Sequence, residues 1–452
     1  MNFSFLLAYN RRMFETMRRC SLLLLVGLLL AACGARPTPI PTPEPLFSLA
    51  APTPTARPPD APLFVLGHFS GAAEQPMRDL LERFAAERDI TVEYEGNGDV
   101  AERLRALVIE GRTPDVILLP KPNWLREMAA AGAIPALSEE VTAEVRANFG
   151  PAWVDLVSYE GELYGIPLDA NAKSLLWYRP AAFEEWNAEP PGTFDELLTL
   201  AGTIEAEGIG VFAVPGEPGW PLTDWFESVL LATAGPETYD DLAAHRVPWT
   251  DPAVEEAAAQ FVSLLRDDWL MGGAERAVTM PLRAEPFRDA FDPDDPGAAM
   301  WLGHGGGVRS LISQSGLEES DFGFFPLPAS GGIVGIGSVA VGTNDSEATM
   351  DLLNFLAQPE AVEPWVEAGG FTSPNLEVPL DSYPTELARQ EAALIREAPL
   401  FRYDLSDLLP PNLQATLYDQ LRAMLLQPEA LPAILAEIEQ IAHREQGAAT
   451  GQ

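Results

Sequence analysis

The sequence predicts an α/β fold with two lobes and a ligand crevice, and three features lead to this class. A chain of 452 residues that is 47% apolar can bury more than one core, so two to three compact units are expected. From residue 63 onward, strand-like apolar runs alternate with amphipathic helical stretches, which is typical of βαβ units and a mostly parallel sheet. Strand patterns return beyond residue 210, where a second lobe can form. Ligands of such folds bind in a crevice at the sheet ends, often between domains.

The individual elements follow from the spacing of apolar residues. Residues 75–88, for example, carry apolar side chains at helical spacing, at Met77, Leu80, Leu81 and Phe84. We expect strands at 63–66, 90–94, 115–119, 210–214, 322–325 and 333–341. We expect helices at 75–88, 100–109, 253–265, 348–356 and 413–426.

Charge and cysteine content exclude several classes of function. The formal charge is −39, and residues 1–32 contribute +3 from four arginines and one glutamate, which leaves −42 for the remainder. Such a field repels nucleic acids and anionic lipid surfaces, whereas a neutral or cationic solute remains compatible with it. The only cysteines are Cys20 and Cys33, both near the N-terminus, so the folded body has no disulfide and no thiolate metal site.

The N-terminal segment has the features of an export signal. Arginines at 11, 12, 18 and 19 precede an apolar stretch at 22–30, and Ala31 and Ala32 lead to Cys33. The apolar stretch is shorter than the roughly 20 residues that span a membrane. Residues 30–34 resemble the lipobox of bacterial lipoproteins, which implies that residues 1–32 are a signal peptide and that Cys33 becomes a lipidated N-terminus.

A proline-rich segment separates Cys33 from the folded body. Residues 33–62 contain ten prolines, interleaved with threonine and alanine. Proline at this density removes backbone donors and favours extended conformations. We therefore expect a stalk that holds the globular part away from a membrane.

Sequence blocks along the body resemble the bacterial extracellular solute-binding protein family that includes maltose-binding protein. Blocks at 97–99, 111–116, 125–134 and 162–167 are similar to the family in general. Blocks at 171–178, 191–197, 219–225, 234–239, 322–328 and 369–374 are most similar to the α-glucoside-binding components of ABC importers. The segment 300–304 departs from that branch, which leaves the identity of the ligand open.

The resemblance implies a periplasmic-binding-protein-like fold, with a cleft and a hinge between the lobes. It assigns residues 63–170 and 330–374 to lobe 1, and residues 171–329 and 375–445 to lobe 2. It also implies a monomer, tethered by its lipid to the outer face of the cell membrane, in a periplasm or on a cell surface. The expected partners are a small sugar and the permease subunits of an ABC transporter, and no cofactor is expected.

A sugar site needs aromatic platforms beside planar hydrogen-bonding groups. Trp220, Asp224 and Trp225 supply both kinds within six positions, so we expect the two indoles to form walls and Asp224 to accept from ring hydroxyls. The alternative for the tryptophan pair is ordinary core packing. Asn171 and Trp177 lie in a block similar to the α-glucoside branch and are candidates on that ground.

The two lysines of the chain are also candidates. Only Lys121 and Lys173 stand against 26 arginines, so we expect that lysine is specifically required at these positions, where its compact ammonium can bond a sugar hydroxyl. The alternative is that both are chance surface lysines. Lys173 lies at the expected crossing between lobes, and Lys121 follows a strand. Asp99 also follows a strand and either points into the cleft or caps the next helix.

Trp301 and His304 complete the candidate set, in a glycine-rich segment at 303–307. The segment lacks the Lys-Ser/Thr pair of a phosphate-binding loop. No catalytic or metal-ligating motif is apparent, because the four histidines are spread widely along the chain and no Gly-x-Ser-x-Gly pattern occurs.

The function that these observations favour is capture of a sugar, an α-glucoside or small oligosaccharide, for an ABC importer, without enzymatic activity. A polyol or a peptide remains an alternative ligand. A surface glycoside hydrolase is a further alternative, and it would need two carboxylates about 5 to 10 Å apart.

Overall fold

The computed structural model describes residues 61–328 and 332–450, with side chains to residue 445. The predicted signal peptide, Cys33 and all but the last two residues of the predicted stalk lie outside the described residues. Among the helices that are described, none combines the length and the apolar character needed to cross a membrane.

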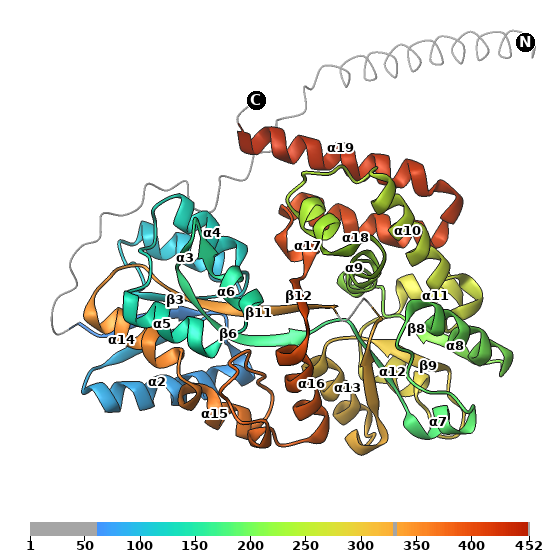
Figure 1. Ribbon diagram of the computed structural model, residues 1–452, viewed down its shortest axis with the longest axis horizontal. Coiled ribbons are helices and arrows are strands. Elements are labelled where there is room, and N and C mark those ends of the chain that lie inside the picture. Colours follow the sequence, from blue (N-terminus) through green and yellow to red (C-terminus); the bar gives the residue numbers. More distant parts are fainter. Residues whose placement is uncertain (1–60, 329–331, 451–452) are drawn as a thin grey trace, which may run out of the picture. The chain divides into compact units, whose positions relative to one another are not determined.

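The strands form two main sheets (Figure 1). The first sheet has the order β12-β11-β3-β1-β2, with β6 paired to β11, and its strands are β1 (Leu63–Gly67), β2 (Val92–Gly96), β3 (Val116–Leu119), β6 (Gly165–Ala172), β11 (Gly332–Gly342) and β12 (Leu400–Tyr403). The second sheet has the order β10-β7-β9-β8, from β7 (Leu175–Tyr178), β8 (Gly210–Ala213), β9 (Ala298–Leu302) and β10 (Gly323–Pro326). A separate pair joins β4 (Ser158–Tyr159) to β5 (Glu162–Leu163).

Helices connect these strands and cover the sheets (Figure 1). In the first part of the chain they are α2 (Glu74–Arg88), α3 (Val100–Ile109), α4 (Asn123–Ala130), α5 (Glu139–Asn148), α6 (Pro151–Leu156), α7 (Pro180–Glu185), α8 (Phe194–Ala206) and α9 (Trp220–Ala243). They continue as α10 (Pro252–Leu264), α11 (Gly273–Thr279), α12 (Ala284–Ala290), α13 (Gly305–Ser315), α14 (Glu347–Leu356), α15 (Pro359–Ala368) and α16 (Glu386–Glu397). The last are α17 (Leu405–Leu408), α18 (Pro411–Leu426) and α19 (Leu431–Thr450).

All the strands and helices expected from apolar spacing are confirmed, with ends that differ by no more than two residues. The expectation of a mostly parallel sheet is met only in part, because three of the five pairings in the first sheet are parallel and only one of the three in the second. β1 pairs in parallel with β2 and β3, as βαβ units require, but β11 runs antiparallel to both β3 and β6. In the second sheet β7 is antiparallel to both of its neighbours. Both sheets are therefore mixed, because strands that enter from distant parts of the chain complete them.

Side chains of the second sheet are divided between two apolar clusters. Leu175 and Trp177 of β7 belong to the cluster that also fills the first sheet's core, whereas Leu176 belongs to the cluster under α9, α10, α18 and α19. Successive side chains of a strand point to opposite faces, which explains the division. The second sheet is thus buried on both faces.

The chain passes between the sheets in short connections. β6 ends at Ala172 and β7 begins at Leu175, so only Lys173 and Ser174 separate the first sheet from the second. The Lys173 amide donates to the Val334 carbonyl at 2.8 Å, at the start of β11. Beyond β12, the Asp404 amide donates to the Gly335 carbonyl at 2.8 Å, just before α17. The β6–β7 connection and the segment after β12 therefore lie next to each other, because both form backbone hydrogen bonds to β11.

One difference from the expected lobes concerns the C-terminal part. β12 pairs in parallel with β11, so residues 400–403 belong to the first sheet although the sequence assigned them to lobe 2. From Leu405 onward, the buried apolar residues belong to the second cluster. The chain therefore leaves the first sheet and enters the second apolar cluster at Asp404.

We expect the tight start of α9 to tolerate no side chain at Gly219. This residue has a φ of 91°, and a Cβ there would lie 2.6 Å from the Cβ of Tyr418 on α18. Left-handed strain and the clash together predict that Gly219→Ala lowers the free energy of unfolding by about 2 kcal/mol or more. Urea denaturation measures this change.

Gly202 provides the matched control. It is an exposed glycine inside α8, and nothing lies within 4 Å of a Cβ built there. Because glycine is a poor helix former, Gly202→Ala should raise the free energy of unfolding by about 0.5–1 kcal/mol. Equal effects of the two substitutions would show that the start of α9 is not constrained by Tyr418.

Candidate functional site

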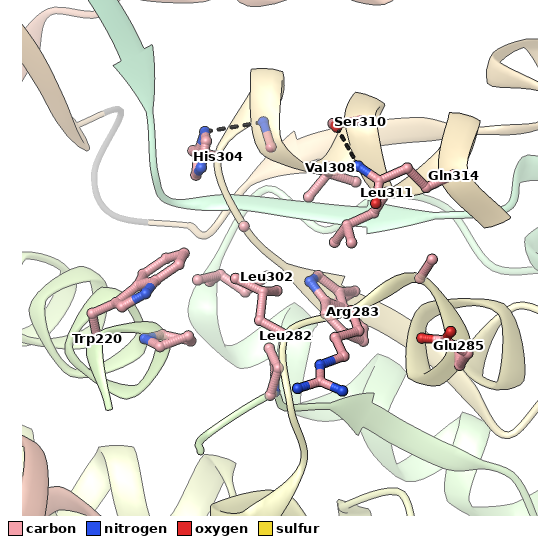
Figure 2. Close-up of a pocket in the computed structure, with 16 residues that line it drawn as sticks. Trp220, Leu282, Arg283, Glu285, Leu302, His304, Val308, Ser310, Leu311 and Gln314 are labelled. Carbon is pink, nitrogen blue, oxygen red and sulfur yellow. Dashed lines mark hydrogen bonds between the residues drawn. The ribbon is translucent and has the colours of Figure 1, made fainter. Parts of the chain in front are cut away.

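A pocket of about 420 Å³ lies between the start of α9, the start of α12, the end of β9 and α13 (Figure 2). Its volume falls in the range of small-molecule sites. Three of the residues expected in the site line it: Trp220, Trp301 and His304. The other lining residues are Pro215, Pro221, Leu282, Arg283, Ala284, Glu285, Leu302, Gly303, Gly307, Val308, Ser310, Leu311 and Gln314.

Trp220 is the aromatic platform of this pocket. Its side chain is partly exposed, and its ring centroid lies 6.2 Å from that of His304. The ammonium of Lys173 lies 5.2 Å from the indole centroid, within range of a cation–π interaction. One face of the indole can thus receive a ligand while the lysine holds the ring in place.

A buried ionic cluster supports Trp220. Asp224 and Glu227 follow Trp220 at i+4 and i+7, so all three lie on one face of α9. Lys173 Nζ lies 2.7 Å from Asp224 Oδ1 and also contacts Asp404 Oδ2. All four charged side chains of the cluster, Lys173, Asp224, Glu227 and Asp404, are buried.

The carboxylates of the cluster differ in protonation because one ammonium cannot balance three of them. Burial raises the pKa of Asp224 to about 8, although Lys173 pulls in the opposite direction. Burial also raises the pKa of Glu227 well above its ordinary value. Burial alone would raise the pKa of Asp404 too, but Lys173 outweighs it and holds that pKa below the ordinary value. Asp404 is therefore the principal counter-ion of the lysine.

Lys173 stays charged in this setting. Burial works to lower its pKa, but Asp224 and Asp404 outweigh that effect and hold it well above the ordinary lysine value. Its ammonium is committed to these two carboxylates. Lys173 thus occupies the expected crossing between the sheets, where it supports the site from beneath and does not line the pocket.

His304 is placed by the helix that it caps. Its Nδ1 accepts a hydrogen bond from the Gly307 amide at 3.1 Å, at the start of α13 (Figure 2). Burial lowers the pKa of His304 to about 4, and Lys173 and Arg309 act in the same direction. The imidazole is therefore neutral at pH 7, with its proton on Nε2, because Nδ1 serves as an acceptor.

Close approach explains the glycine-rich segment around His304. A Cβ at Gly305 would lie 1.9 Å from Glu391 Oε2, and one at Gly307 would lie 2.4 Å from His304 Nε2. Glu391 is buried on α16 and pairs with Arg309 of α13 at 2.6 Å. The glycines thus make room for a buried ion pair and for the capping imidazole.

The candidate Lys121 and several polar side chains that the sequence did not single out lie on or just after strands of the first sheet. Burial lowers the pKa of His68, although the charge of Asp169 opposes the shift. Tyr403 donates to the Pro120 carbonyl at 3.0 Å. Lys121, which follows β3, pairs with Asp407 of α17 at 3.0 Å. The carboxyl end of parallel strands is where ligands of open α/β sheets bind.

Three of the expected aromatic residues belong to the core. Trp225 lies at i+5 from Trp220, so it points to another side of α9, where it is fully buried with its ring centroid 4.9 Å from that of Phe212. The expectation that it forms a wall is therefore wrong for this structure. Trp177 and Trp301 are cross-strand partners on one face of the second sheet and are also buried. Trp301 reaches the pocket wall, whereas Trp177 does not.

The remaining expected residues lie outside the pocket wall. Asp99 is exposed and caps α3, where its Oδ1 accepts from the Glu102 amide at 2.9 Å. This geometry matches the capping alternative. Asn171 lies near the end of β6, and a Cβ at Gly306 would come within 3.3 Å of its Oδ1. Asp224 lies one turn below Trp220, and its Oδ2 has no hydrogen-bond partner among the described residues.

The family model described as bacterial extracellular solute-binding protein matches residues 70–363. The chain belongs to this family of bacterial extracellular solute-binding proteins. The matched region contains all the residues that line the pocket. It also contains Lys173, Asp224 and Glu227, whereas Asp404 lies beyond it.

Two relatives match most of this solute-binding protein. The osmoprotective compounds-binding protein of Synechocystis sp. is 29% identical over 357 residues, which cover 76% of this chain and 84% of the relative. The alpha-glucosides-binding periplasmic protein of Rhizobium meliloti is 29% identical over 373 residues, 78% of this chain and 81% of the relative.

The fold of the solute-binding protein is shared with solved structures. A bacterial solute receptor with a substrate preference for β-D-galactopyranose superposes with a TM-score of 0.76 at 16% identity, over 85% of this chain and 99% of the receptor. At this identity the similarity establishes the fold alone.

The two lysines should differ sharply in their importance for stability. Lys173→Met leaves the buried carboxylates without a counter-ion and should cost about 3–5 kcal/mol of unfolding free energy. Lys121→Met removes a partly exposed pair with Asp407 and should cost about 1 kcal/mol or less. Denaturant unfolding of both variants tests this, and equal losses would contradict the central role of Lys173.

The pKa of Asp224 predicts a pH-dependent stability. Because the folded-state value of about 8 exceeds the unfolded value near 3.9, the folded state holds this proton more tightly. The contribution of this proton to the free energy of unfolding is at its maximum below pH 4. It declines as the pH rises to 8, by as much as about 5 kcal/mol. Asp224→Asn should flatten this decline.

The test is denaturant unfolding of both proteins at several values between pH 4 and pH 8. Asp404 has a lowered pKa in the folded state, so it stabilises the fold at any pH above the pKa that it has in the unfolded state. Its contribution is therefore constant across most of the range from pH 4 to pH 8. Parallel stability curves for the two proteins would show that Asp224 is ionised throughout.

Proposed function

We propose that this protein captures a sugar of the α-glucoside class and delivers it to the permease of an ABC transporter. The observation that carries the proposal is the partly exposed indole of Trp220, set in a pocket of about 420 Å³ beside the neutral imidazole of His304. A sugar offers an apolar face for stacking and hydroxyls for hydrogen bonding. His304 supplies a donor without a net charge, which suits a neutral ligand.

The relatives support a solute of this kind. One of the two relatives at 29% identity is an α-glucoside-binding protein of Rhizobium meliloti. The other binds osmoprotective compounds, which makes a polyol or another neutral osmoprotective solute the second candidate ligand. Both candidates are compatible with the strongly acidic composition, since neither requires an anion-binding surface.

In the proposed mechanism, the ligand stabilises a closed arrangement of two lobes. One lobe is built on the first sheet, from residues 63–172 and 332–403, and the other on the second sheet, from residues 173–328 and 404–445. The polar groups around Lys121, Asp169 and Tyr403 face the ligand from the first lobe, and Trp220 and His304 face it from the second. Cys33 and the stalk would tether the monomer to the membrane, so that the closed form can meet the permease.

A glycoside hydrolase remains the enzymatic alternative. Among the residues that line the pocket, Glu285 is the one carboxylate, and a hydrolase would need a pair. Asp224 and Asp404 are buried and both contact Lys173. This arrangement stabilises the lysine and leaves neither group on the pocket wall, which favours binding over hydrolysis. Turnover of an aryl α-glucoside by the purified protein would decide for the enzyme.

Thermal unfolding in the presence of candidate ligands tests the proposal. Trehalose, maltose, sucrose, palatinose and glucose should be compared with glycerol, sorbitol and short peptides. A ligand that binds only the folded state raises the melting temperature, and at 100 times its Kd it stabilises by about 2.7 kcal/mol. We expect the shift from an α-glucoside, whereas a shift from polyols or peptides alone would contradict that ligand class.

Two tryptophan variants locate the site by calorimetric titration of the ligand. Trp220→Ala should weaken binding at least tenfold, about 1.4 kcal/mol, because the stacking platform is lost. Trp186→Ala removes an indole of similar exposure that packs against the second cluster, away from the pocket. If both variants bind the ligand with the same affinity as the unmodified protein, the ligand does not bind at Trp220.

A further inference from the structure

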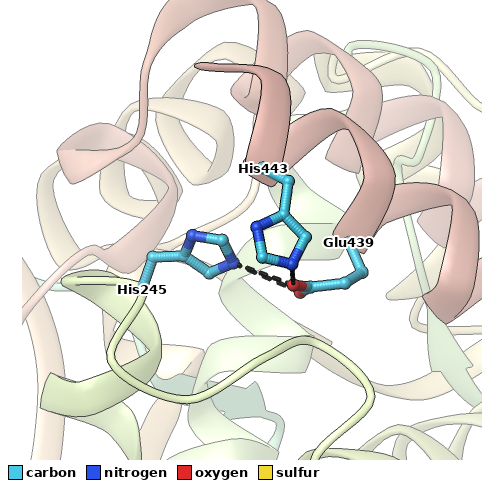
Figure 3. A group of neighbouring side chains, drawn as sticks. All are labelled: His245, Glu439 and His443. Carbon is cyan, nitrogen blue, oxygen red and sulfur yellow. Dashed lines mark hydrogen bonds and ion pairs between the residues drawn. The ribbon is translucent and has the colours of Figure 1, made fainter. Parts of the chain in front are cut away.

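Two side chains of α19 and one from a distant part of the sequence converge on one point (Figure 3). His245 Nε2 lies 3.2 Å from both carboxylate oxygens of Glu439, and His443 Nε2 lies 2.8 Å from Glu439 Oε1. One donor atom from each of the three residues lies within 4.8 Å of the others. Both imidazoles therefore present a ring nitrogen to the same carboxylate.

The backbone places these groups firmly. Glu439 and His443 are at i and i+4 on α19, so their side chains lie on one face of the helix. His245 follows α9 and has a left-handed backbone with a φ of 49°, an uncommon conformation outside glycine. Glu439 is itself oriented by the Trp249 amide, which donates to Oε2 at 2.7 Å. That hydrogen bond leaves Oε1 directed at the two rings.

We propose that His245, Glu439 and His443 bind a divalent transition-metal ion of the zinc type. Two imidazole nitrogens and one carboxylate are a ligand set that Zn²⁺ accepts, with a fourth position open to water. A tetrahedral ion with bonds of about 2.05 Å separates its ligand atoms by about 3.3 Å. The observed separations of 2.8 and 3.2 Å to Oε1 are already close to this value.

The three residues account for the protons and the charge when the metal ion binds. Both imidazoles coordinate as neutral rings through Nε2, so the hydrogens that now face Glu439 move to Nδ1 or leave to solvent. The carboxylate offsets one of the two positive charges of the ion. His443 is largely exposed, with 69% of its side-chain surface accessible, so the ion can enter from solvent.

This site is independent of the proposed ligand pocket, and the sequence gives it separate weight. The whole chain has only four histidines, yet two of them meet at one carboxylate, with ring centroids 5.2 Å apart. A chain with a formal charge of −39 also concentrates cations near its surface. A bound ion would fasten α19 to the segment that follows α9.

Titration of the full chain, purified without a histidine tag, with ZnCl₂ tests the site. Millimolar Ca²⁺ and 150 mM salt should be present to occupy non-specific carboxylate sites. We expect one Zn²⁺ per chain and a rise of the melting temperature by about 2 °C or more. Co²⁺ should bind with the intense visible absorption of a four-coordinate complex, which carboxylates on the surface do not produce.

Two variants distinguish the site from general binding to acidic groups. His443→Gln keeps an N–H donor for Glu439 but lacks the ring nitrogen, so Zn²⁺ affinity should fall at least about tenfold. Glu437→Gln removes an exposed carboxylate from the same helix and should leave Zn²⁺ affinity unchanged. Unaltered Zn²⁺ binding in His443→Gln, or no stoichiometric binding by the unmodified chain, would overturn the proposal. In either case the three residues serve only as a hydrogen-bonded contact.

Discussion

The contacts of the buried Lys173 ammonium with Asp224 and Asp404 are the constraint on which the remainder of the site depends. Lys173 belongs to the two-residue passage from β6 to β7, Asp404 to the passage from β12 to α17, and Asp224 to the helix that carries Trp220. Buried charges are tolerated only when they are paired and hydrogen-bonded. The burial of this one lysine therefore requires both passages and α9 to meet at a single place, directly beneath the aromatic platform.

The chemistry above the cluster follows from the same burial. A low-dielectric setting keeps His304 neutral and favours the protonated form of Asp224 near neutral pH. The charged side chains on the pocket wall are Arg283 and Glu285. Outside the pocket, the surface carries a strong negative field. The negative field repels anions at a distance, which is compatible with the neutral solute proposed above.

The sequence correctly predicted the secondary-structure elements that depend only on residues close to one another in the chain. The amphipathic spacing of α2 and the apolar run of β1 are set within a dozen residues, and both elements lie where they were expected. Lys173 was expected to bind the ligand, from its rarity and from the family resemblance, whereas in the structure it contacts buried carboxylates and does not line the pocket. The direction of β11 could not be predicted in this way, because it depends on pairing with β3 and β6 across more than 150 residues. The same holds for Trp225, whose burial depends on Phe212, and for His245 and His443, which only the packing of α19 brings together.

The brevity of the passage at Lys173 and Ser174 has a mechanical consequence. Two residues held by backbone and side-chain hydrogen bonds to Val334 leave no slack between β6 and β7. The two sheets cannot slide past each other without breaking these bonds, whereas small changes in a few backbone torsions can swing one against the other. Such a pivot acts as a lever: displacement grows with distance from the axis, so a modest rotation beneath Trp220 moves the outer helices farthest. If the ligand closes the two lobes as proposed, a surface far from the pocket would therefore report whether the pocket is filled.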